Sequence, residues 1–317
     1  MLIRTIHFEY TTGCNSRCMM CDYWKKDTHV VLQNEMVLSV VETLTPKGLR
    51  KIYFTGGECL IYAERLFEVC KQIRLSFPNL ELGLITNGIL LKKYYNEIGS
   101  LFSKVIISLD TVDSNKYEKI RGISALGIVQ SGIHLLRKEY PQVKINLRAL
   151  VLNETIEDIP AILDYAIEER LHHVSFIPED VSSRDAFGRC GMMPQRHNKD
   201  TEDFIQLFRM IDVVKSNYSL LFGTILPRAC EDLEYIYAIY TENPKQCRKC
   251  NKASSSCVIS ASGIVSPCFF IRGSQALKQN ETIEAVLESE KYHRMITTIM
   301  NGKYAECLTC ACPKELS

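Results

Sequence analysis

The chain has 317 residues, of which 46% are hydrophobic and 24% are charged. These proportions exclude wholesale disorder and a fibrous repeat, and the length suggests roughly two structural units. Lysine and arginine number 38 against 37 acidic residues, a balance that disfavours nucleic acid and anionic membranes as partners. Because no apolar run reaches about 18 residues and the first residues lack signal-peptide features, we expect a cytoplasmic protein.

Strands and helices alternate along the first half of the chain. Runs of apolar and β-branched residues predict strands at 3–10, 51–55, 82–86, 105–109, 144–152 and 173–177. Helical spacing of apolar residues predicts helices at 35–44, 62–77, 91–101, 125–139 and 156–170. This alternation indicates an α/β fold of parallel βαβ units with right-handed crossovers. Six such units make a partial (β/α)6 barrel of the TIM type.

The pattern changes after the sixth strand. Residues 179–200 are polar and interrupted by glycine and proline, which indicates a boundary loop. Two helices, two short strands around a Ser262-Gly263 turn and a last helix are predicted beyond it, at 202–216, 231–240, 257–261, 264–268 and 282–300. We therefore divide the chain into a barrel (1–180), a connecting region (181–245) and a small domain of a β-hairpin and a helix (246–317).

Fourteen cysteines are too few for a disulfide scaffold of this length, and they are grouped rather than spread. One group, Cys14, Cys18 and Cys21, directly follows the first strand, at the end where parallel α/β folds place their chemistry. Three thiolates in one loop suit three irons of a [4Fe–4S] cubane, whose fourth iron stays open to an outside ligand. A zinc loop completed by a distant ligand and simple packing are the alternatives.

The spacing C-x3-C-x2-C after the first strand resembles that of the radical S-adenosylmethionine (SAM) enzymes, over about residues 3–178. The resemblance implies a catalytic [4Fe–4S] cluster that binds SAM and cleaves it to a 5′-deoxyadenosyl radical. It also implies a reducing electron donor of the flavodoxin or ferredoxin type.

Further candidates for SAM binding follow the next strands. The resemblance implies a methionine-amine site at Thr55-Gly56-Gly57-Glu58, although the same residues suit a tight turn. It implies a ribose contact for Ser108 and a contact to the methionine carboxylate for Arg148. The carboxylate of Asp110 also suits sugar hydroxyls, and Asn87, after the third strand, is a further cofactor-binding candidate. The alternative interpretations are a simple turn for Asn87, solvated strand ends for Ser108 and Asp110, and an internal salt bridge for Arg148. His7 and Glu9 alternate on the first strand, so that both are expected to point into the barrel.

A second group of cysteines lies in the last quarter of the chain. Cys250 and Cys268 flank the predicted hairpin, and Cys307-x2-Cys310 follows the last helix. Four thiolates suit zinc or a second [4Fe–4S] cluster. The arrangement resembles the twitch domain, a short form of the SPASM domain, which implies an auxiliary cluster. It stays open whether one of three other nearby cysteines, Cys247, Cys257 or Cys312, replaces one of these four as a ligand.

The resemblance implies a radical SAM oxidoreductase that removes hydrogen from a small polar substrate of the polyol or aminocyclitol type. The auxiliary cluster would accept the second electron. A peptide-modifying enzyme is the alternative, in which Cys190 or Cys230 returns a hydrogen atom to the substrate, and a non-enzymatic zinc protein is a third interpretation. The spacing around Cys250 and Cys268 differs from C-x2-C-x13-C and argues against a close relation to the molybdopterin-precursor cyclases.

Overall fold

The structure is a computed structural model in which nine strands form one sheet. It describes residues 1–180, 183–184, 186–189, 201–219, 229–240, 250–273, 275–277, 281–307 and 310. Within these ranges, no helix is both long enough and apolar enough to cross a membrane.

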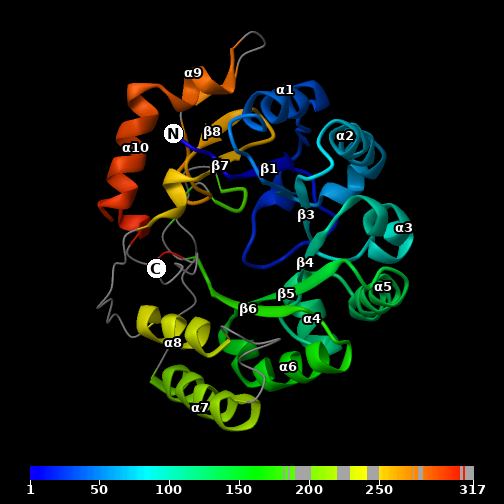
Figure 1. The fold of residues 1–317 in the computed structure, drawn as a ribbon. Helices are drawn as coiled ribbons and strands as arrows, with labels where there is room; N and C mark the ends of the chain where they lie inside the picture. The colour runs from blue at the N-terminus through cyan, green and yellow to red at the C-terminus, as the bar shows by residue number, and fades with distance from the viewer. Residues whose placement is uncertain are drawn as a thin grey trace.

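The first six strands form the partial barrel, and neighbouring strands in it are parallel. The strand order is β6-β5-β4-β3-β2-β1-β7-β8-β9. Figure 1 shows these strands at the centre of the molecule with helices outside them. The barrel strands are β1 (Thr5–Thr11), β2 (Lys51–Gly56), β3 (Glu81–Thr86), β4 (Lys104–Ser108), β5 (Lys144–Val151) and β6 (His173–Pro178).

Helices follow the barrel strands and cover the outer face of the sheet (Figure 1). These are α1 (Asn34–Leu44), α2 (Ala63–Ser76), α3 (Leu91–Leu101), α4 (Ser114–Arg121), α5 (Leu126–Glu139) and α6 (Ile159–Glu168). Two more helices, α7 (Thr201–Tyr218) and α8 (Ala229–Tyr240), pack against each other, and α8 also packs against β6.

Alternation along β1 separates the core from the barrel interior. Ile6, Phe8 and Tyr10 are fully buried in the main hydrophobic core. Because side chains alternate along a strand, His7 and Glu9 point to the opposite face, into the barrel, as expected. The α/β fold with a mostly parallel sheet is therefore confirmed.

The C-terminal hairpin extends the same sheet. Strand β7 (Ser256–Ile259) runs parallel to β1, with Ile6 opposite Cys257. Strand β8 (Ile264–Ser266) and the short β9 (Gln275–Ala276) continue it in antiparallel fashion. Two helices, α9 (Ile283–Leu287) and α10 (Glu290–Met300), follow the hairpin.

The structure differs from the prediction at two places in the helices. The single helix expected over 282–300 is two helices, because Ser289 has an extended backbone and its hydroxyl accepts from the Tyr292 amide to begin α10. Helix α4 is absent from the sequence prediction because its residues are mostly polar. Its boundaries carry recognisable signals, since the Asp113 side chain caps its start and Gly122 is left-handed at its end.

Candidate active site

The three cysteines of the first group lie together in the loop after β1. Their charges act on one another, because Cys18 contributes to raising the pKa of Cys14 and also that of Cys21. Burial is the main cause in both cases and raises the pKa of Cys14 to about 11 and of Cys21 to about 12. The donor set of three adjacent thiols fits three irons of a [4Fe–4S] cluster, and cluster binding therefore has to displace their protons.

The end of β2 holds this loop through backbone hydrogen bonds. The amide of Gly57 donates to the Thr11 carbonyl, and the amide of Glu58 donates to the Gly13 carbonyl, both at 2.7 Å. A Cβ on Gly57 would lie 2.0 Å from the Gly13 oxygen, and Gly56 has a φ of +126°. Two successive glycines are therefore required for the close approach of these backbones.

Glu58 is completely buried and links β2 to β3. Its carboxylate accepts from the Thr86 hydroxyl at 2.8 Å, the Asn87 amide at 2.7 Å and the Leu60 amide at 3.2 Å. Burial raises the pKa of Glu58, while these hydrogen bonds act in the opposite direction. The three donors therefore fix the Glu58 carboxylate between the end of β2 and the turn after β3.

Asn87 contacts the cysteine loop directly. Its side-chain Nδ2 donates to Asn15 Oδ1 at 2.7 Å and to Ser16 Oγ at 3.0 Å, and it lies 4.0 Å from Cys14 Sγ. Its own Oδ1 accepts from the Ile89 amide at 3.1 Å. The turn after β3 therefore fixes the residues that follow Cys14.

The sequence analysis missed Arg121, the last residue of α4. Its Nη2 pairs with Asp110 Oδ2 at 2.6 Å, and its Nη1 donates to Cys18 Sγ at 3.9 Å. The other Asp110 oxygen accepts from the Leu150 amide at 2.9 Å. Asp110, predicted as a ribose contact, is 1% exposed and forms this buried ion pair beside the cysteine loop.

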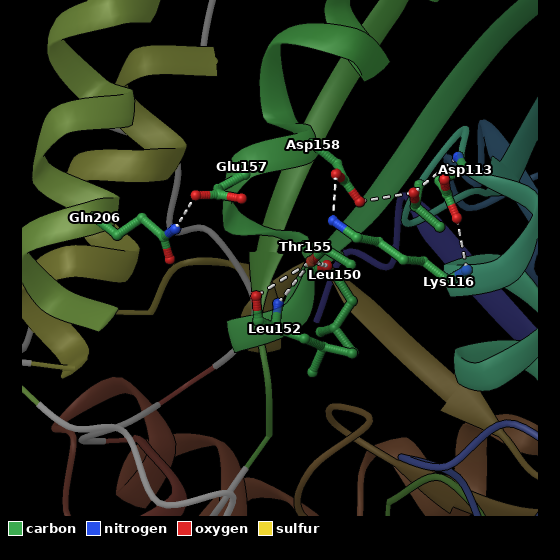
Figure 2. Close-up of polar contacts among 9 residues, drawn as sticks. Asp113, Lys116, Leu150, Leu152, Thr155, Glu157, Asp158 and Gln206 are labelled. Atoms are coloured by element: carbon green, nitrogen blue, oxygen red, sulfur yellow. Dashed lines mark hydrogen bonds and ion pairs between the residues drawn. The ribbon is translucent and has the colours of Figure 1, made fainter. Parts of the chain in front are cut away.

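Helix α4 is fixed to the helical segment after β5, the 3-10 helix Asn153–Asp158 (Figure 2). Asp158 accepts from Lys116 Nζ and from the Thr111 hydroxyl, both at 2.7 Å. The 3-10 helix is in turn held to α7, where Gln206 donates to Glu157 at 2.5 Å. These contacts fix the helix that carries Arg121 without touching a cysteine.

Cys21 meets a segment that the sequence predicted as a boundary loop. Its thiol donates to the Phe187 carbonyl at 3.4 Å, and the Asp22 amide donates to the same carbonyl at 2.8 Å. Phe187 has a φ of +53°, an uncommon conformation for a residue with a side chain. A buried pair between Arg189 and Asp180 at 2.7 Å closes this turn. The described part of 179–200 is therefore an ordered wall of the site.

Two other predicted SAM contacts lie opposite each other on neighbouring strands. Ser108 ends β4 and is paired in register with Arg148 of β5. The residues flanking Arg148, Leu147 and Ala149, are buried in the core, so Arg148 points into the barrel. Thr55, the residue before the last of β2, lies on the same inner face, opposite Glu9.

His7 points into the barrel, where its ring packs between two aromatic side chains. The His7 ring stacks on Tyr53 with centroids 5.1 Å apart and meets Phe269 edge-on at 4.9 Å. Burial, followed by the charges of Arg148 and Lys252, lowers the pKa of His7 to about 3. The His7 imidazole is consequently neutral at ordinary pH, and its Nδ1 is buried without a hydrogen-bond partner.

A buried carboxylate links the cysteine loop to the C-terminal hairpin. Glu9 accepts two hydrogen bonds from Arg272, at 2.5 and 2.9 Å, and one from the Tyr23 hydroxyl at 3.0 Å. Tyr23 lies two residues after Cys21, and Arg272 lies four residues after Cys268. Glu9 thus ties the two cysteine-bearing segments together.

The second group of cysteines gathers around a small apolar cluster. Cys307 is part of it, and Cys250 and Cys268 pack against it. Burial raises the pKa of Cys268 to about 12, with further contributions from Cys250 and Cys307. The carbonyl of Cys310 accepts from the Tyr235 hydroxyl at 2.7 Å. These thiols suit a [4Fe–4S] cluster by their donor type.

The remaining cysteines divide into three cases, and the first also includes Cys59 and Cys70, which are fully buried in the main core. Cys257 is fully buried on the core face of β7, opposite Ile6, where it packs like a small apolar residue. Cys230 is half-buried at the start of α8, where Lys215 and Glu234 influence its pKa. A hydrogen-donor role for Cys230 stays a prediction. Cys190, Cys247 and Cys312 lie outside the described residues.

Comparison with known proteins agrees with the fold and the cysteine loop. A model of the radical SAM superfamily matches residues 8–166. A probable GTP 3′,8-cyclase of Methanococcus maripaludis is 30% identical over 184 residues, 56% of this chain and 60% of its own length. The GTP 3′,8-cyclase of Campylobacter jejuni is 25% identical over 287 residues, 87% of this chain and 83% of its own. The chain thus spans about 60% of the Methanococcus relatives it matches.

Solved structures resemble the chain over nearly its whole length. Streptococcus suis SuiB bound to precursor peptide SuiA has a TM-score of 0.68 and 16% identity, covering 98% of this chain and 70% of its own. The protein anSMEcpe with bound AdoMet has a TM-score of 0.66 and 18% identity, covering 98% and 88%. At such identities, these likenesses show the fold alone.

The comparisons correct the predicted reaction. Both the oxidation of a polyol-like substrate and the peptide-modifying alternative are wrong, because the sequence relatives are named GTP 3′,8-cyclases. The argument from cysteine spacing against the cyclases fails for the same reason. Cysteine spacing determines where a cluster is held, but the substrate is determined by the barrel interior, for which the sequence offered no motif.

Proposed function

The chain belongs to the radical SAM superfamily, and on that premise we propose that it cleaves SAM and directs the resulting radical at GTP. The observation that carries the substrate is the 25% identity to a GTP 3′,8-cyclase over 87% of the chain. A match of that length extends well beyond the region that the family model covers. The reaction proposed for this chain is therefore formation of a bond between C3′ and C8 of GTP.

In this proposal, Cys14, Cys18 and Cys21 hold the catalytic [4Fe–4S] cluster. The cluster, once reduced by a flavodoxin or ferredoxin-type donor, supplies the electron that cleaves SAM. Gly56 and Gly57, which let the end of β2 approach the cysteine loop, lie at the proposed site of the methionine part of SAM. Further SAM contacts are assigned to Glu58, Asn87, Ser108 and Arg148.

Charge inside the barrel supports an anionic substrate. Arg148 and Lys252 both act on His7, as their effect on its pKa indicates. Arg148 points into the barrel, and a cation there favours binding of an anionic group such as a triphosphate.

An auxiliary [4Fe–4S] cluster held by Cys250, Cys268, Cys307 and Cys310 completes the proposal. Those residues follow the twitch-like pattern, and three of them share one apolar cluster. The Glu9–Arg272 pair, which ties the Cys268 segment to the cysteine loop, supports an auxiliary cluster beside the same barrel.

The test is turnover of GTP deuterated at C3′, by reconstituted protein with SAM and a reductant. We expect one deuterium in each 5′-deoxyadenosine and a cyclised product with the formula of GTP, because the lost hydrogen atom is replaced by one electron and one proton. ATP deuterated at C3′ is the matched control, since it carries the same phosphates on another base. Unlabelled 5′-deoxyadenosine with unchanged GTP would contradict the proposal.

A further inference from the structure

Arg121 is placed between a carboxylate and a cysteine of the loop. Its side chain is only 10% exposed, and its Nη2 lies 2.6 Å from Asp110 Oδ2. Its Nη1 points to Cys18 Sγ at 3.9 Å. The pKa of Arg121 is raised: burial acts against the charge, but Asp110 and Cys18 outweigh it, so the guanidinium is a permanent cation.

The backbone around Arg121 is joined to the same loop. The Arg17 amide donates to the Arg121 carbonyl, and the Met19 amide donates to the Ile120 carbonyl, both at 3.0 Å. A Cβ on Gly122 would lie 2.5 Å from the Arg17 carbonyl oxygen, so the loop and the helix end are in close contact. The guanidinium is therefore held at a fixed position relative to Cys18.

We propose that Arg121 is a positioning residue that sets the reduction potential of the catalytic cluster through the Cys18 sulfur. This inference rests on the proposed role of Cys18 as an iron ligand. Reduction adds one negative charge to a cluster, and hydrogen bonds to its sulfurs and nearby charges shift its potential. Arg121 stabilises the reduced cluster and raises the potential.

Asp110 acts in the opposite direction. Its negative charge also acts on Cys18 and partly cancels that of the guanidinium, but Arg121 has the larger effect and contacts the sulfur directly. Removing each charge in turn therefore has opposite effects on the potential. A purely structural role of the pair produces no such reversal of sign.

The experiment is an EPR-monitored redox titration of the reconstituted protein without SAM. The signal that changes when SAM is added identifies the catalytic cluster. For Arg121→Gln we expect the fraction reduced at a fixed potential to fall about tenfold, which is about 59 mV for one electron. For Asp110→Asn we expect it to rise. Lys116→Gln is the matched control, because Lys116 fixes the same helix without contacting a cysteine. The catalytic cluster of this variant should keep the reduction potential of the parent.

If Arg121→Gln does not bind the cluster, two other variants still test the proposal. Asp110→Asn still has to raise the potential, and Arg121→Lys, which keeps the charge, has to stay closer to the parent. Parent-like potentials in Asp110→Asn, or shifts of the same sign in Asp110→Asn and Arg121→Gln, would overturn the inference. A SAM-sensitive signal that survives Cys18→Ala would instead show that the proposed ligand set is wrong.

Discussion

Gly57→Ala is the sharpest test of how the second strand supports the cysteine loop. The new Cβ would lie 2.0 Å from the Gly13 oxygen and 2.6 Å from the Gly13 carbonyl carbon. Both are backbone atoms, so no side-chain rotation relieves the contact. Because ordinary contact begins at 3.4 Å, the two segments have to separate by about 1.4 Å.

That separation breaks two hydrogen bonds of 2.7 Å, from Gly57 to the Thr11 carbonyl and from Glu58 to the Gly13 carbonyl. With a cost of about 1–3 kcal/mol for each broken bond, the variant should lose roughly 2–6 kcal/mol of unfolding free energy. It should also lose SAM binding, since the loop that carries Cys14 is displaced.

The assay is urea unfolding of the cluster-free protein, with SAM binding measured separately on the reconstituted form. Gly127→Ala is the control, because a Cβ there has nothing within 4 Å and Gly127 lies in helix α5. That control should gain about 0.5–1 kcal/mol. Unfolding of Gly57→Ala within about 0.5 kcal/mol of the parent would refute the argument from close approach.

Two further predictions concern cysteine roles and pH. Cys268→Ala should lower the iron bound per chain, while Cys257→Ala should leave it unchanged because Cys257 packs in the core; equal iron loss in both would contradict the ligand assignment. His7 has a folded pKa of about 3 against 6.5 unfolded, so the unfolded chain binds its proton first as the pH falls below 6.5. At pH 5 this proton uptake lowers the unfolding free energy of the parent by about 2 kcal/mol. Because phenylalanine takes up no proton, His7→Phe should lose about 2 kcal/mol less unfolding free energy than the parent between pH 7.5 and pH 5. The measurement is urea unfolding of the cluster-free protein at both pH values. An unchanged pH dependence in His7→Phe would contradict the neutral, buried state of His7.

The sequence predicted what local patterns determine. The six barrel strands and the cysteine loop follow from alternation and spacing. The hairpin was also anticipated from its glycine turn, but its parallel pairing with β1 depends on contacts between residues about 250 positions apart, which no local pattern records.

The missed features depend on tertiary contacts. Helix α4 has a polar sequence, and its Arg121 gained a role only because Asp110 and Cys18 lie beside it. Phe187 adopts its uncommon backbone conformation because its carbonyl accepts from both Asp22 and Cys21. A turn rich in glycine and polar residues gives no such indication in the sequence.

The most direct test of the central claim is 5′-deoxyadenosine formation by a variant in which Cys14, Cys18 and Cys21 are all alanine. The reconstituted parent should form it from SAM and a reductant, while the triple variant should form none and still retain iron at the second group of cysteines. Undiminished 5′-deoxyadenosine formation by the triple variant would contradict the assignment of these three thiols to the catalytic cluster.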